Sequence, residues 1–297
     1  MKTKFLLYGH KGWIGSKVLK ELENQSIDII LGNSRVENVQ DLEEEIIRVN
    51  PTHIISTIGR THGTYNNKVY STIDYLEQSG KLVDNVQDNL FGPVVLALLS
   101  KKYNFHLSYL GTGCIFEFDQ NHPFGEEING FNEKSLPNFY GSSYSIVKGF
   151  TDQLMHLFDT NVLNIRIRMP ITDEFNSRNF ITKITNYAKI CSVPNSMTVL
   201  DELIPIMIDM AMNNRTGTIN MTNPGLITHN EILQMYKDIV DPSFEWINFT
   251  IDEQNAILDS GRSNNYLDTS LLQKLYPNVK NIKDSVREVL LRMATKI

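Results

Sequence analysis

Short apolar runs alternate with longer amphipathic stretches over the first part of the chain. Apolar runs of five or six residues predict strands that are buried on both faces. They span residues 4–8, 27–31, 53–57, 105–110 and 162–167. Helical periodicity lies between them, at residues 13–24, 38–49, 79–102 (with a bend expected at Pro93) and 141–158. This alternation predicts an α/β fold with a doubly wound parallel sheet.

Beyond residue 170 the pattern loosens. Helices are expected near residues 179–190, 200–212, 228–239 and 281–296, and short strands at 217–221 and 244–249. Loops rich in Asn, Pro and Gly separate these segments. We therefore expect one domain at residues 1–170 and a smaller part at 171–297, with an interleaved boundary allowed and a ligand-binding cleft between them.

Composition narrows the classes of function. The chain has 297 residues, with 28 Lys and Arg against 34 Asp and Glu and a formal charge of −6, so nucleic acid is not an expected partner. Two cysteines without CxxC spacing and seven scattered histidines argue against disulfides and a metal site. No stretch approaches the roughly 18 apolar residues that span a bilayer, so we expect a cytoplasmic protein without a membrane anchor.

A glycine-rich turn follows the first predicted strand. Residues 9–15 read Gly-His-Lys-Gly-Trp-Ile-Gly, and this GxxGxxG spacing opens the first helix. Glycine has no Cβ, so a ligand can approach the backbone closely, and the unpaired amides at the N-terminus of the helix point at it. Both features suit the pyrophosphate of a dinucleotide in a Rossmann domain. A plain tight turn is the alternative. The expected cofactor contacts are Gly9, Gly12, Trp13, Ile14 and Gly15.

The tip of the second strand indicates which dinucleotide binds. Residues 31–35 read Leu-Gly-Asn-Ser-Arg and lack the carboxylate that binds the ribose hydroxyls in NAD-selective folds. Arg35 can pair with a 2′-phosphate, so NADPH is the expected cofactor. A solvated loop arginine is the alternative.

A tyrosine and a lysine share one face of a predicted helix. Tyr144 and Lys148 are four residues apart, one above the other. The phenol can protonate an alkoxide formed by hydride transfer, while the ammonium lowers the phenol pKa from about 10 and can hold a cofactor hydroxyl. A second YxxxK at residues 276–280 fails, because Pro277 disfavours a helix. Thr112, after the fourth strand, can bond the same carbonyl oxygen or be an ordinary turn residue.

These residues together resemble the extended short-chain dehydrogenase/reductases. Longer strings narrow the resemblance to the epimerase-reductase part of plant-type nucleotide-rhamnose synthases, over nearly the whole chain. The strings are GTGCIFE at 111–117, RIRMPI at 166–171, RNFITKI at 178–184, PNSMTVLDEL at 194–203, TNPG at 222–225 and RSNN at 262–265. The resemblance implies a bifunctional 3,5-epimerase/4-reductase that converts UDP-4-keto-6-deoxy-D-glucose to UDP-β-L-rhamnose with NADPH.

Inversion at C3 and C5 requires one group that removes a proton and another that returns it on the opposite face. By resemblance, Cys114 and Lys183 form this pair, and which is acid and which is base stays open. A small buried cysteine and a solvated lysine are the alternatives. Lys183 can be a base only if burial or a neighbouring cation lowers its pKa from about 10.4.

Further residues are assigned to the substrate. His62 follows the third strand at the carboxyl edge, and Asn179 lies in the matched string RNFITKI. Arg262 offers a planar guanidinium for the diphosphate. Asn89 resembles an asparagine that orders its helix against the active site in this superfamily. A loop histidine, a core asparagine and a solvated arginine are the alternatives.

Other functions stay open on the sequence. A dTDP-linked 4-reductase or a nucleotide-sugar 4-epimerase needs Tyr144 and Lys148 but not Cys114 and Lys183, and a cofactor-sensing binding protein needs no turnover. No residue distinguishes a UDP from a dTDP carrier. The plant-type enzymes carry a fused 4,6-dehydratase, so a separate dehydratase is expected upstream. The resemblance also implies a homodimer.

Overall fold

A computed structural model describes residues 3–296 of the chain. Within them the chain forms two compact units, of which the first contains residues up to Thr112 together with 142–166 and 204–219. The second unit contains residues 113–141, 167–203 and those from Asn220 onward. The units are thus interleaved rather than divided once near residue 170, because local periodicity does not show which unit a returning segment packs in.

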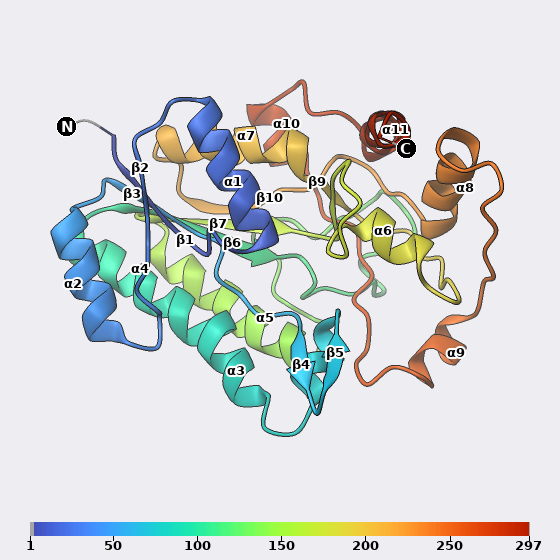
Figure 1. Cartoon of the computed structure of the whole chain (residues 1–297), viewed down its shortest axis with the longest axis horizontal. Coiled ribbons are helices and arrows are strands. Elements are labelled where there is room, and N and C mark those ends of the chain that lie inside the picture. The colour runs from blue at the N-terminus through green and yellow to red at the C-terminus, as the bar shows by residue number, and fades with distance from the viewer. Residues whose placement is uncertain (1–2, 297) are drawn as a thin grey trace. The chain divides into compact units, whose positions relative to one another are not determined.

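A six-stranded sheet is the centre of the first unit, within the described residues (Figure 1). Its order is β10-β7-β6-β3-β1-β2. The strands are β1 (Phe5–Tyr8), β2 (Ile29–Leu31), β3 (His53–Ser56), β6 (His106–Thr112), β7 (Val162–Ile167) and β10 (Gly217–Asn220). The pairs β1–β2, β1–β3 and β3–β6 are parallel. All five strands expected before residue 170 are confirmed, and the strand expected at 217–221 extends this same sheet.

Helices cover both faces of this sheet (Figure 1). On one face are α1 (Trp13–Asn24) and α7 (Leu200–Met212), and on the other α2 (Val39–Val49), α4 (Gly92–Tyr103) and α5 (Ser143–Met155). The expected bend at Pro93 is instead a π-helical turn at residues 87–91, between α3 (Leu82–Val86) and α4. Pro93 follows this turn within a continuous helix, and the Asn89 carbonyl oxygen, which its missing N–H leaves without a helical donor, accepts a hydrogen bond from Thr151.

A short hairpin in the first unit was not predicted. It consists of β4 (Gly63–Tyr65) and β5 (Lys68–Tyr70), which pair antiparallel. Asn66 and Asn67 between them have positive φ values of 47° and 60°, as in a type I′ turn. The Asn-Asn pair was the available sequence signal, but its flanking strands are too short to show clear alternation.

The regular secondary structure of the second unit is mainly helical, and long loops connect its elements. Its helices are α6 (Phe180–Thr185), α8 (His229–Ile239), α9 (Ile251–Asn255), α10 (Ser270–Leu275) and α11 (Ile282–Ala294), and β8 (Pro170–Ile171) pairs with β9 (Thr198–Val199). The prediction of a strand at 244–249 is wrong. Phe244 and Trp246 pack against the core while Ile247 is 64% exposed, and Asn248 makes only an isolated bridge to Ile190. The helix expected at 179–190 ends at Thr185, since residues 186–189 are exposed. No helix among the described residues has the length and apolarity to span a membrane.

Two buried histidines meet across the sheet of the first unit. His53 and His106 are register partners on β3 and β6, with ring centroids 5.4 Å apart. His106 Nε2 lies 2.6 Å from the carbonyl oxygen of Arg215, so Nε2 donates and Nδ1 is the deprotonated nitrogen. Burial, with a smaller contribution from the charge of His53, lowers the pKa of His106 to about 4. Burial also lowers the pKa of His53.

We expect the free energy of unfolding to decrease as the pH falls from 7 to 5. An unfolded histidine binds a proton below about pH 6.5 while folded His106 does so only near 4, so protons are taken up first by the unfolded chain. His106 then accounts for a loss of about 2 kcal/mol over this range. Urea unfolding at both pH values should show a smaller loss in His106→Gln, whose amide can still donate to Arg215. The half-buried His122→Gln is the control, and equal losses in all three proteins would contradict the prediction.

Candidate active site

The glycine turn of the first unit forms a tight cradle between β1 and α1. Gly9 has a φ of +80°, and a Cβ there would lie 2.5 Å from Thr57 Oγ1. A Cβ on Gly15 would lie 2.1 Å from the Gly9 carbonyl oxygen. Gly12 is the N-cap of α1, no side chain caps this helix and no acidic residue lies in its first turn. The positive end of the helix dipole and the backbone cradle therefore fit a dinucleotide pyrophosphate. Thr57, the residue that follows β3, was missed because only the fold brings it here.

Arg35 lies in the loop that follows β2. Its side chain is 70% exposed and forms an ion pair with Glu37. Glu45 holds this loop, accepting hydrogen bonds from the backbone N–H groups of Asn33 and Ser34, each 3.0 Å long. Arg35 is the basic residue of residues 32–38. A 2′-phosphate at this loop would therefore compete with Glu37 for the guanidinium.

Helix α5 holds the predicted tyrosine and lysine in the first unit. Ser142 caps its N-terminus by accepting a 3.0 Å hydrogen bond from the Ser145 N–H. Tyr144 and Lys148 are both buried on successive turns. Lys148 Nζ lies 3.4 Å from the Leu110 carbonyl oxygen, two residues before Thr112, which ends β6. The fold thus brings the predicted pair to the carboxyl end of β6.

Asn89 connects two elements of the first unit. Its side chain accepts a 3.0 Å hydrogen bond from the Arg60 N–H and donates a 2.8 Å one to the Arg60 carbonyl oxygen. Thr151 of α5 donates to the Asn89 carbonyl oxygen at 2.6 Å. Asn89 therefore ties the segment after β3 to the helix that carries Tyr144. His62 lies two residues beyond Arg60, half-buried between β3 and β4.

Cys114 lies in the second unit, beside a buried arginine. It is half-buried, whereas Cys191 is buried. Arg168 donates to the Gly113 carbonyl oxygen at 3.2 Å and to Asn195 Oδ1 at 2.7 Å. Burial lowers the pKa of Arg168, and its interaction with Cys114 offsets part of that effect.

Lys183 lies on α6 of the second unit, four residues after the helix N-cap, Asn179. Burial lowers the pKa of Lys183 to about 8, with the positive charges of Arg178 and Arg262 acting in the same direction. The pKa of Lys183 is therefore lowered, as a role as a base requires. Asn179 is fully buried and donates two 2.8 Å hydrogen bonds to the carbonyl oxygens of Thr172 and Glu174. This placement favours a role in positioning α6 over direct contact with a substrate.

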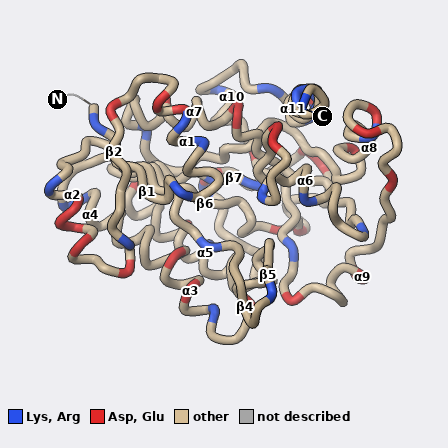
Figure 2. The backbone as a smooth tube through the Cα atoms, viewed as in Figure 1, with Lys and Arg blue, Asp and Glu red and all other residues tan. Residues whose placement is uncertain are grey.

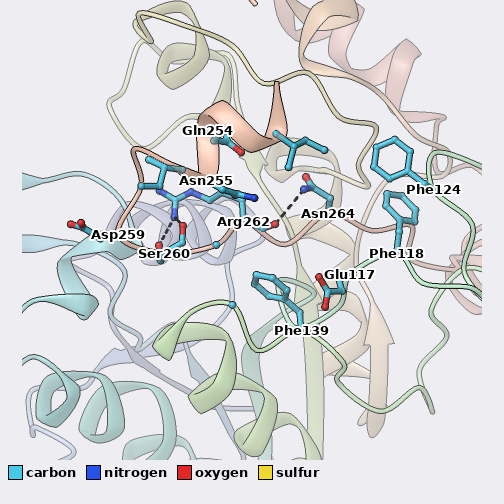
Figure 3. A pocket seen from close by; sticks show the side chains of 14 residues that line it. Glu117, Phe118, Phe124, Phe139, Gln254, Asn255, Asp259, Ser260, Arg262 and Asn264 are labelled. Atoms are coloured by element: carbon cyan, nitrogen blue, oxygen red, sulfur yellow. Dashed lines mark hydrogen bonds between the residues drawn. The ribbon is translucent and has the colours of Figure 1, made fainter. Parts of the chain in front are cut away.

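A cavity of about 440 Å³ opens beside Arg262 within the second unit (Figure 3). Three phenylalanines, several amides and two acids line it with Arg262: Glu117, Phe118, Phe124, Phe139, Gln254, Asn255, Asp259 and Asn264. Arg262 Nη1 donates to the Ser260 carbonyl oxygen at 3.0 Å. The charge of the candidate phosphate ligand Arg262 also acts on the candidate acid/base Lys183. The cavity beside Arg262 suits a ligand that is both aromatic and polar.

The second YxxxK motif, at residues 276–280, does not lie within one helix. Tyr276 ends α10, and Lys280 of the same motif pairs with Glu288, so the second YxxxK is not a helical pair, as predicted. Lys and Arg are interspersed with Asp and Glu along the chain (Figure 2). Within residues 3–296, no cluster of three or more His, Cys, Asp or Glu side chains is arranged to hold a metal.

Comparison with known proteins gives strong similarities over the whole chain, although no protein-family model matches it. The UDP-rhamnose synthase L780 of Acanthamoeba polyphaga mimivirus is 57% identical over 290 residues, 98% of each chain. Its crystal structure has a TM-score of 0.93 and covers 99% of this chain and 100% of its own.

Plant and bacterial proteins extend the comparison. The chain is 43% identical to an Arabidopsis thaliana bifunctional dTDP-4-dehydrorhamnose 3,5-epimerase/reductase, over 95% of this chain and 90% of that one. It is also 43% identical to an Arabidopsis thaliana trifunctional UDP-glucose 4,6-dehydratase/3,5-epimerase/reductase, of which it spans 41%. A Bacillus anthracis dTDP-4-dehydrorhamnose reductase in complex with NADP shares the fold, with a TM-score of 0.79 at 17% identity and full coverage of both chains.

Arg178→Met is expected to raise the pKa of Lys183 above its value of about 8, by about one unit, because one of two nearby positive charges is removed. NMR titration of ¹³C-labelled lysine, assigned with Lys183→Met, measures this pKa. Arg287→Met, on the exposed side of α11 in the same unit, is the control and should leave the pKa unchanged. No rise in Arg178→Met would show that the charge of Arg178 does not contribute to the lowered pKa and would contradict the prediction.

Proposed function

The chain belongs to the family of nucleotide-rhamnose 3,5-epimerase/4-reductases, and from this premise we propose that it converts UDP-4-keto-6-deoxy-D-glucose to UDP-β-L-rhamnose with NADPH. The observation that carries the proposal is the presence of Cys114 and Lys183, which a plain reductase does not need, together with the burial and neighbouring charges that lower the pKa of Lys183 to about 8. UDP is the proposed carrier, because the relative of 57% identity is named a UDP-rhamnose synthase.

The reductase step uses residues of the first unit. The glycine turn would hold the pyrophosphate of NADPH and Arg35 its 2′-phosphate, and the bound cofactor would supply a hydride to C4 of the keto-sugar. Tyr144 donates its phenolic proton to the C4 oxygen, so that the carbonyl becomes a hydroxyl. The Lys148 ammonium favours loss of that proton and holds a cofactor hydroxyl, and Thr112 hydrogen-bonds the same oxygen.

The epimerase step uses residues of the second unit. The ketone at C4 acidifies the C–H bonds at C3 and C5, and at each carbon Cys114 and Lys183 remove a proton from one face and return one to the other. With a pKa of about 8, Lys183 has sizeable neutral and charged fractions near neutral pH, so it can serve in either direction.

The remaining contacts concern the nucleotide and the supply of substrate. We assign the diphosphate to Arg262 and the nucleoside to the aromatic cavity beside it, with His62 on the sugar and Asn179 positioning α6. The 4-keto-6-deoxy substrate requires a 4,6-dehydratase upstream, an activity named in the trifunctional relatives. A cytoplasmic location stays a prediction.

Solvent deuterium separates the two half-reactions. In deuterated buffer, Cys114→Ser should lose at least about 100-fold in the rate of deuterium incorporation at C3 and C5, because a serine hydroxyl is a far weaker acid than a thiol. Tyr144→Phe should still incorporate deuterium but no longer oxidise NADPH. Cys191→Ser is the matched control for the thiol. NADPH oxidation without deuterium incorporation by the unmodified protein would instead identify a plain 4-reductase.

We also propose that two copies pair through a face formed by α3, α5 and the turns next to them. This face of the first unit exposes the large apolar side chains of Leu82, Val83, Phe91, Phe150 and Leu157, and α3 packs against α5. Exposed apolar side chains on adjoining elements are typical of a protein–protein contact.

Phe150→Glu tests this pairing. The buried carboxylate that the substitution would place in the contact should convert a dimer to a monomer in analytical ultracentrifugation, without lowering the midpoint of urea unfolding measured at low protein concentration. Leu98→Glu, at an exposed position of α4, is the control. A sedimentation coefficient that is the same for Phe150→Glu and the unmodified protein would exclude this face.

A further inference from the structure

Two buried side chains of opposite charge lie one turn apart on α5. Lys148 and Asp152 are 4% and 3% exposed, and their spacing of four residues places them on the same side of the helix. Such a pair is positioned to form an intrahelical ion pair. An ion pair would neutralise the ammonium and draw it along the helix, away from Tyr144.

The Asp152 carboxylate is bound by another cation. Arg166 of β7 donates from Nε to Asp152 Oδ1 at 2.8 Å and from Nη2 to Oδ2 at 2.7 Å. Asn164, two residues earlier on the same strand, donates to Oδ1 at 2.8 Å. Arg166 is fully buried. This bidentate pairing satisfies both carboxylate oxygens and balances the charge of Asp152 within the sheet–helix contact.

Lys148 extends instead towards the end of β6. Its Nζ donates to the Tyr109 hydroxyl and lies 4.7 Å from the centroid of that ring. Burial, with the charges of Tyr144 and Asp152 adding to it, raises the pKa of Tyr109 well above its ordinary value. Tyr109 therefore remains a neutral phenol, which accepts the hydrogen bond without cancelling the positive charge.

We propose that Tyr109 and Arg166 are positioning residues for Lys148. Arg166 occupies the carboxylate that would otherwise capture the ammonium, and Tyr109 supplies a neutral acceptor that holds Nζ at the carboxyl end of β6. The charge of Lys148 then acts on the Tyr144 phenol and on a cofactor hydroxyl. The inference rests on the proposed reductase activity and goes beyond it, because it assigns a task to two residues that touch neither substrate nor reacting atoms.

Tyr109→Phe removes only the acceptor oxygen. We expect kcat for reduction of the keto-sugar to fall about tenfold, and the Kd of NADPH measured by fluorescence to rise about threefold, since a hydrogen bond to a charged group is lost. Deuterium incorporation at C3 and C5, which uses Cys114 and Lys183, should not change. Tyr75→Phe is the control, because Tyr75 is equally buried and donates to Asp84 at 2.8 Å.

Arg166→Gln removes the cation that binds Asp152. Lys148 is then expected to pair with Asp152, so reduction slows while deuterium incorporation continues. Asp152→Asn in the same chain removes the competing charge and should restore at least half of the lost reduction rate. A merely structural role of Arg166 predicts instead that reduction and deuterium incorporation fall together and recover together, because Asp152→Asn also removes the unpaired buried charge. A loss and a rescue confined to reduction support the positioning role.

The outcomes separate this inference from the proposed function. Reduction and NADPH binding of Tyr109→Phe that equal those of Tyr75→Phe would overturn the positioning role of Tyr109. If Tyr109→Phe lowered the rates of reduction and of deuterium incorporation equally, the positioning role would also be overturned, since equal losses indicate a general disruption of the protein. Absence of reduction or of deuterium incorporation in the unmodified protein would overturn the proposed function instead. If Arg166→Gln does not fold, the NADPH affinity and the two rates of Tyr109→Phe still decide the case.

Discussion

The buried ion pair between Asp152 and Arg166 fixes α5 on the sheet of the first unit. Taking two charges out of water is costly, and this cost is offset only because both carboxylate oxygens accept well-aligned hydrogen bonds. Removal of one partner would leave a buried charge and cost about 3–5 kcal/mol. Since Tyr144 and Lys148 lie on the same helix, this contact helps to hold them over the end of β6, together with the hydrogen bond from Thr151 to the Asn89 carbonyl oxygen.

A second buried arginine organises the other unit. Arg168 donates to the Gly113 carbonyl oxygen, and Asn265 donates to the carbonyl oxygens of Gly113 and Phe116, each at 2.9 Å. The loop that carries Cys114 is thereby tied to the loop that carries Arg262. Arg178 and Arg262 meanwhile lower the pKa of Lys183. Burial is the larger cause of that lowered pKa, and the same two positive charges attract an anionic diphosphate.

Much of the fold and of the site followed from local patterns. Apolar runs fixed the five first strands, because a strand covered on both faces must be apolar at nearly every position. The glycine spacing between β1 and α1 was readable because only glycine permits that backbone approach. Pro277 sufficed to discard the second YxxxK, and long strings such as GTGCIFE carried the family, which the relatives then confirmed.

Side-chain pairing across distant segments was decided by the tertiary structure alone. Nothing in the sequence around Lys148 shows that Asp152 is bound by Arg166, or that Tyr109 accepts from the ammonium, because these contacts join α5 to two separate strands. The pKa of Lys183 likewise depends on Arg262, 79 positions along the chain. Periodicity and local motifs record which residues are buried and how the backbone turns, whereas charge balance in the interior depends on which buried groups the fold places together.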